Sequence, residues 1–165
     1  MKTIIFVLIL ITCSMKGYSQ NFIDSTFTYG GVNYKVLSDN TSSIMTIYNV
    51  ANPENISAKV LSRTRMINYQ QLKVSIVGVF KSILTSTQVV GLQSERPIII
   101  NLFVDATSKI NIVYLFQSDY NTCLTQANIY NIEIALKNIV VQFQDGLPPE
   151  AGQLGSIGIP KRMWR

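Results

Sequence analysis

The chain has 165 residues, of which 47% are hydrophobic and 14% charged, and its formal net charge is +5. This length suits one domain, and it allows a core large enough to fold without disulfides or a metal. The absence of histidine excludes Ser-His-Asp and Cys-His catalysis and the commonest zinc ligand, and the scattered cations form no basic stripe suited to nucleic acid.

The first nineteen residues have the pattern of a secretory signal peptide. Lys2 precedes an unbroken apolar run over residues 4–11, and the small residues Gly17 and Ser19 follow it. The run covers about 12 Å as a helix, whereas the hydrocarbon core of a membrane is about 30 Å thick. We therefore expect export to remove residues 1–19. A single periplasmic or extracellular domain, residues 20–165, then remains with a net charge of +3.

Cys13 allows a second interpretation of this segment. Leu10-Ile11-Thr12-Cys13 resembles a bacterial lipobox, in which the cysteine is lipidated, although Thr12 stands where Gly, Ala or Ser is usual. An outer-membrane lipoprotein anchored at Cys13 is therefore the alternative to a soluble form that begins at Gln20. In the soluble form Cys123 has no cysteine partner, so we expect a fold without a disulfide.

Strands are predicted in the first part of the mature chain. Residues 27–29 and 32–36 alternate around Gly30-Gly31, a pair whose access to positive φ favours a tight hairpin. Residues 44–50 form a further strand candidate, and residues 56–61 form a weaker one.

The middle of the chain first changes to a helical period. Apolar residues recur at steps of three and four from Asn68 to Leu84, which predicts a helix. Residues 87–92 are expected to add a short helical turn. Farther along, the β-branched and aromatic runs 98–104 and 110–116 flank a five-residue polar turn, and this pattern predicts a hairpin at the centre of a sheet.

The C-terminal part is predicted to hold another helix and a last strand. Apolar positions from Leu124 to Val140 mark an amphipathic helix whose N-cap is Thr122 or Thr125. Residues 144–155 are rich in Gly and Pro, which indicates an exposed loop, and residues 157–159 alternate as a short strand. Together the elements predict an α+β fold with two layers, in which two helices pack on a mainly antiparallel sheet.

Residues 98–159 resemble the C-terminal domain of TonB-type proteins. The resemblance rests on Val104-Asp105 at the hairpin turn, on Ala135-Leu136-Lys137 in the following helix and on a final strand after a Pro-containing loop. The chain also resembles an uncharacterised family of small exported Bacteroides proteins, a domain of unknown function with a similar Phe-Val-Asp hairpin. TonB proteins carry an uncleaved anchor and a long Pro-rich spacer, which this chain lacks, so the resemblance implies a two-layer fold suited to protein binding and not energy coupling.

Few side chains are candidates for catalysis. Cys123 adjoins an apolar helix without a neighbouring base, so we expect a small core or boundary residue and not a nucleophile. Asp105 lies in the predicted hairpin turn, where Asp is favoured for its local hydrogen bonds, and Asp119 precedes a loop, which argues against a glycosidase pair. With neither a nucleophile elbow nor a phosphate-binding glycine loop, we predict no enzyme activity and no metal or cofactor.

The C-terminal residues Lys161, Arg162 and Trp164 are the candidate partner-binding group, because Arg and Trp are over-represented at binding hot spots. The alternatives are that Trp164 folds back over a sheet edge or that the tail is frayed. We predict a non-catalytic exported domain that binds a protein partner or assembles with itself, and the alternative is a glycan- or peptide-binding module. A row of exposed Tyr and Trp would favour glycan. Membrane contact is expected only if Cys13 is lipidated.

Overall fold

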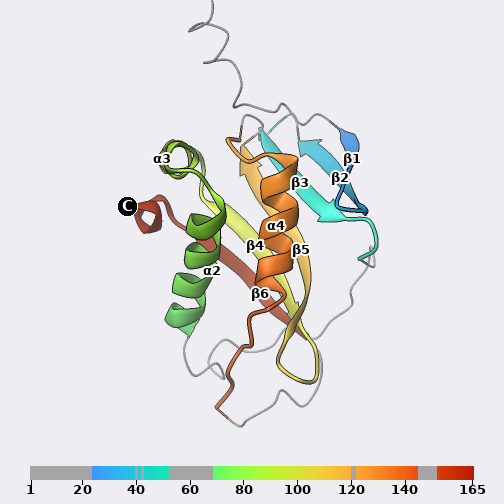
Figure 1. Cartoon of the computed structure of the whole chain (residues 1–165), viewed down its shortest axis with the longest axis vertical. Helices are drawn as coiled ribbons and strands as arrows, with labels where there is room; N and C mark the ends of the chain where they lie inside the picture. Colours follow the sequence, from blue (N-terminus) through green and yellow to red (C-terminus); the bar gives the residue numbers. More distant parts are fainter. Residues whose placement is uncertain (1–23, 40, 42, 53–68, 120–121, 145–151) are drawn as a thin grey trace, which may run out of the picture.

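The fold is described from a computed structural model over residues 24–39, 41, 43–52, 69–119, 122–144 and 152–165 (Figure 1). The described strands form one antiparallel sheet in the order β1-β2-β3-β5-β4-β6. The strands are β1 (Ser25–Tyr29), β2 (Val32–Asp39), β3 (Ile44–Asn49), β4 (Ile98–Val104), β5 (Ile110–Asp119) and β6 (Gly152–Ile159). The helices are α2 (Tyr69–Ile83), α3 (Ser86–Ser94), α4 (Gln126–Leu136) and the 3₁₀ turn η2 (Lys161–Trp164).

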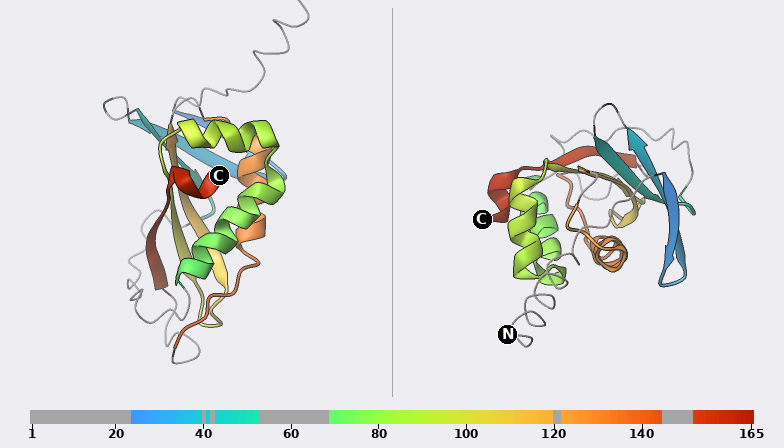
Figure 2. Two further views of the ribbon diagram at one scale, coloured as in Figure 1. Left: turned by 90° about the vertical axis from the view of Figure 1, so that its left-hand side faces the viewer. Right: turned by 90° about the horizontal axis from the view of Figure 1, so that it is seen from above.

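The α-helices lie on one face of the sheet, and the β1 end of the sheet curls toward α4 (Figure 2). The predicted α+β class and antiparallel sheet are confirmed, but the described part of the chain has three α-helices where two were expected. The additional helix is α3, which was expected only as a short turn. It forms because Thr85 and Gln88 make a complete capping box, and this motif satisfies N–H groups at a helix start.

The predicted hairpin at Gly30-Gly31 is confirmed. Both glycines have positive φ, +58° and +78°, as a two-residue turn matched to the strand twist requires. Gly30 also lies against α4, since a Cβ built there would stand only 2.4 Å from Cζ of Tyr130. The glycine pair therefore sets both the turn and the approach of the helix.

The β4–β5 hairpin occupies the centre of the sheet, as predicted, with β3 and β6 on its two sides. Its turn is closed by Asp105, whose Oδ1 accepts hydrogen bonds from the backbone N–H of Thr107 at 2.8 Å and of Lys109 at 3.1 Å. The hydrogen bond from the Thr107 hydroxyl is the main reason that the pKa of the Asp105 carboxyl is lowered. Asp105 therefore serves the turn.

The prediction for the last helix is right at its start and wrong at its end. Thr125 is the N-cap and forms a capping box with Asn128, but α4 ends at Leu136 and not at Val140. Beyond it, the carbonyl of Ile139 accepts from the N–H of Ile110 at 3.2 Å, and Val141 donates to the carbonyl of Ser108 at 2.9 Å. These bonds to the β4–β5 hairpin hold the segment extended. Strand β6 likewise begins at Gly152, inside the segment predicted to be a loop.

The core lies between the helices and the covered face of the sheet. Strand β6 contributes Ile157 and Ile159, both fully buried as predicted. Within the described residues, no helix combines the length and the apolar character that crossing a membrane requires. The predictions for the signal peptide, for lipidation of Cys13 and for a strand at residues 56–61 lie outside the described residues.

Candidate binding surface

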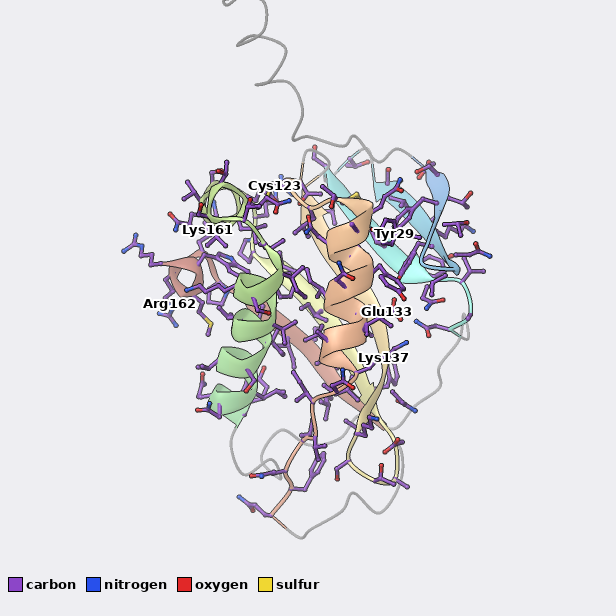
Figure 3. All side chains as sticks on the ribbon, in the orientation of Figure 1. Tyr29, Cys123, Glu133, Lys137, Lys161 and Arg162 are labelled. Atoms are coloured by element: carbon purple, nitrogen blue, oxygen red, sulfur yellow. The ribbon has the colours of Figure 1, made fainter. Side chains whose placement is uncertain are left out.

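The three candidate partner-binding residues at the C-terminus lie in different environments in the structure. Trp164 is buried, with 2% of its surface exposed, and its ring centroid lies 5.4 Å from that of Phe80 on α2. Its backbone carbonyl accepts a hydrogen bond from Gln93 on α3 at 3.2 Å. Lys161 and Arg162 are exposed at the η2 end of the molecule, apart from Glu133 and Lys137 on α4 (Figure 3). Trp164 thus anchors the tail in the core, and the two cations stay on the surface.

Lys161 also has a structural contact. Its Nζ donates to the backbone carbonyl of Ser94, the last residue of α3, at 3.0 Å. Cations at this end of a helix meet unsatisfied carbonyls and the negative end of the helix dipole. Arg162 follows on the same turn and is exposed, so its charge remains open to a partner.

Cys123 is half-buried beside α3 and is disfavoured as a nucleophile. Burial raises the pKa of its thiol to about 12, and the nearby Glu95 carboxylate adds to the shift. The thiol donates to the carbonyl of Gln88 at 3.2 Å. Glu95 itself is buried and accepts from the Cys123 N–H at 2.6 Å and from the Thr122 hydroxyl at 2.9 Å. A neutral thiol held by these bonds has a structural role.

A second buried carboxylate, Glu133 on α4, was not found from the sequence. It accepts hydrogen bonds from the Tyr34 hydroxyl at 2.5 Å and from Asn49 Nδ2 at 3.0 Å, and Lys137 Nζ lies 2.7 Å from its Oε1. Tyr34 and Asn49 are register partners across β2 and β3, so both reach the same helix. Burial is the largest cause that raises the pKa of the Tyr34 hydroxyl, and the bond to Glu133 adds to it.

The sequence does contain a signal for this cluster. Glu133 follows directly on the buried Ile132 and lies one helical turn before Lys137, the spacing of a helical ion pair. Its partners on β2 and β3 are remote in sequence and could not be chosen by pattern. Because each carboxylate oxygen already has a donor, we interpret the cluster as a clamp that fixes α4 on the sheet and not as a reactive site.

A groove lies between α2 and the extended segment that follows α4. Its volume is about 220 Å³, and its lining consists of Gln71, Leu72, Ser75, Ile139, Val140, Val141 and Gln142. We call it the α2 groove. None of these residues is charged, and one large apolar side chain of the lining, Val140, is 61% exposed. Sequence analysis missed the groove because it placed residues 139 and 140 on the helix.

The described aromatic residues do not form an exposed row. Tyr29 is 40% exposed and packs against Tyr130, with ring centroids 5.5 Å apart. Tyr34 and Trp164 are buried, and Tyr48 is half-buried. The aromatic side chains that the structure describes therefore lack the arrangement expected of a glycan-binding sheet face.

Comparisons with known proteins support the fold. No family model and no curated protein matches the sequence. Among solved structures, the chain is similar to the crystal structure of a DUF5043 family protein from Bacteroides uniformis, with a TM-score of 0.67 and 13% identity over 88% of this chain and 96% of that chain. DUF denotes a domain of unknown function. The predicted resemblance to small Bacteroides proteins is confirmed at the level of fold, whereas the comparisons do not show the resemblance to TonB C-terminal domains.

Proposed function

We propose that this chain is an exported, non-catalytic domain that binds a protein partner or a second copy of itself through the α2 groove. The observation that carries the proposal is the exposed Val140 in an uncharged groove whose apolar lining also includes Leu72, Ile139 and Val141. Apolar side chains gathered around a groove are typical of a site where another chain docks.

The described reactive groups favour binding over catalysis. The Glu133 and Glu95 carboxylates are buried and already accept hydrogen bonds from neighbouring side chains or backbone. The Cys123 thiol has a pKa raised to about 12, which keeps it protonated at neutral pH. Groups held in this way stabilise the fold and are poorly suited to attack a substrate.

A peptide ligand is the alternative that the groove favours. A volume of about 220 Å³ admits a few side chains and lies below the size usual for small-molecule pockets. Glycan binding is less well supported because the groove lining holds no aromatic ring.

A photo-crosslinking experiment in the native host tests the proposal. A photoreactive phenylalanine analogue replaces Val140 in one variant and Val90 in another; Val90 lies on α3, and the two valines are equally exposed, at 61% and 62%. We expect a crosslink to one defined protein, or to a second copy, from position 140 and not from position 90. Equal crosslinking at both positions, or none at either, would contradict the proposal. Sedimentation velocity of residues 20–165 then separates self-assembly from binding to another protein.

The same cultures test export. Mass spectrometry of the mature protein should show a chain that begins at Gln20. A lipidated chain that begins at Cys13 would instead make the protein an outer-membrane lipoprotein.

A further inference from the structure

The main chain of Val140 has an open side. Lys109 and Val140 form an isolated antiparallel bridge, whose hydrogen bonds are made by their neighbours, Ile110 to Ile139 and Val141 to Ser108. Val140 is therefore in a non-hydrogen-bonded pair, and its own N–H and C=O point away from the hairpin. The N–H of Lys109 donates to Oδ1 of Asp105, and the carbonyl of Lys109 accepts from the N–H of Asp105, so both groups are used inside the turn. The N–H and C=O of Val140 have no hydrogen-bond partner within the described part of the chain.

The open side of this bridge faces the α2 groove. The segment after α4 descends between α2 and the β4–β5 hairpin (Figure 1). Since Ser108 and Ile110 bond to one side of the segment, the opposite side looks toward α2. Gln71, Leu72 and Ser75 of α2 form the facing wall. An unpaired N–H and C=O at the edge of a groove are the elements of a strand-addition site.

The groove lining specifies the kind of chain that fits. Leu72 is buried at 7% exposure, and Gln71, Ser75 and Gln142 supply amide and hydroxyl groups without any charge. A charged side chain would lose hydration there without gaining a counter-charge. The volume of about 220 Å³ has room for a few side chains of one extended segment.

We propose that the α2 groove receives an extended, uncharged segment of a partner protein, which pairs as a strand with the main chain of Val140. This inference rests on the function proposed above and adds the form of the partner. The segment accepts from the Val140 N–H and donates to the Val140 carbonyl. Its alternate side chains enter the groove over Leu72.

The experiment uses a blocked peptide of alternating valine and threonine, six residues long, with residues 20–165 of this chain labelled for NMR. We expect the Val140 amide resonance to shift on titration and its hydrogen exchange to slow. A peptide N-methylated at alternate positions lacks donors on one edge and should bind at least about tenfold more weakly, which corresponds to one or two lost hydrogen bonds. Lysine in place of the valines should weaken binding similarly.

Protein variants separate the main chain from the side chain. Val140→Ala retains the N–H and C=O and should weaken binding less than Val140→Pro does, whereas the control Val90→Ala should bind within about threefold of the wild type. Val140→Pro removes the N–H, and Ser75→Phe fills the groove from α2; each should reduce binding at least about tenfold. The N-methylated peptide gives a readout even if Val140→Pro fails to fold.

Several outcomes would overturn the inference. They are equal binding of the N-methylated peptide, full binding by a folded Val140→Pro or Ser75→Phe variant, or no binding of the uncharged peptide. If crosslinking from position 140 succeeds while these tests fail, the binding function stands and strand pairing is wrong. If crosslinking also fails, both are wrong.

Discussion

Gly30 and Gly31 offer a matched pair of substitutions that tests how α4 is seated on the β1–β2 hairpin. Both residues have positive φ, so alanine at either position adopts a left-handed conformation that costs about 1–2 kcal/mol. Their surroundings differ. A Cβ at Gly30 would stand 2.4 Å from Cζ of Tyr130, whereas a Cβ at Gly31 has no atom within 4 Å.

The difference in surroundings sets the expected magnitudes. A Cβ at Gly30 requires the Tyr130 ring to move by about 1 Å to reach ordinary contact, and such overpacking costs about 1–3 kcal/mol. Gly31→Ala should therefore lower the free energy of unfolding by about 1–2 kcal/mol, and Gly30→Ala by about 2–5 kcal/mol. The excess belongs to the contact with the helix and not to the turn.

Urea denaturation, followed by circular dichroism at equilibrium, measures both variants. Tyr130→Ala completes a double-mutant cycle, because it removes the ring that the new Cβ would meet. In that background Gly30→Ala should cost no more than Gly31→Ala. Equal costs of the two glycine substitutions in the wild-type background, or no coupling between Gly30 and Tyr130, would refute the packing of α4 on the hairpin turn.

Three further predictions concern the core, the thiol and the C-terminal tail. Leu136→Ala should lower the free energy of unfolding by about 2–5 kcal/mol, and a loss below about 1 kcal/mol would contradict a well-packed α4. Cys123 should resist iodoacetamide at pH 8 until the protein is unfolded; because its pKa is raised to about 12, the unfolded chain loses this proton first, so stability should fall as pH rises above about 9. Cys123→Ala should make that fall smaller, and an unchanged pH profile would contradict the shift. Trp164→Ala should cost about 3–5 kcal/mol. Lys161→Gln with Arg162→Gln should cost at most about 1 kcal/mol, because it removes only the exposed contact of Lys161 with the end of α3. Lost binding of the crosslinked partner in that double variant would mark the cations as contact residues.

The parts of the fold that were predicted correctly have local signals. The glycine pair at the β1–β2 turn, the two apolar runs of the central hairpin and the Thr125 cap each act within a few residues. Such signals determine turn type, strand period and helix start without reference to the rest of the molecule. The central hairpin and the first residue of α4 could therefore be assigned from sequence alone.

The errors arise where a distant contact decides the local structure. Ile139 and Val140 continue the apolar spacing of α4, but hydrogen bonds to Ser108 and Ile110 hold them extended. For Trp164 the sequence left a partner contact, a sheet-edge cover and a frayed tail open, and its burial against Phe80 is likewise decided by a distant contact. Both contacts join residues far apart in the chain, so the spacing of apolar residues along the sequence does not predict them. The candidate site was missed for the same reason.

The Glu133 clamp and the α2 groove are connected through the end of α4. Glu133 holds the helix to Tyr34 on β2 and to Asn49 on β3, and the chain leaves the helix only three residues after it. Ile139 is then bonded back to the helix through Leu136 and forward to the hairpin through Ile110.

The groove wall is thus fixed from both ends. A buried carboxylate is weak evidence for stability, because the cost of removing it from water offsets much of its attraction to its partners. The Glu133 carboxylate instead fixes the position of α4, because its hydrogen bonds to Tyr34 and Asn49 set where the helix lies along β2 and β3. A hydrophobic side chain at this position would not set it. That position determines where the open edge of Val140 stands relative to α2. The clamp therefore positions one wall of the proposed binding groove, although none of its residues lines the groove.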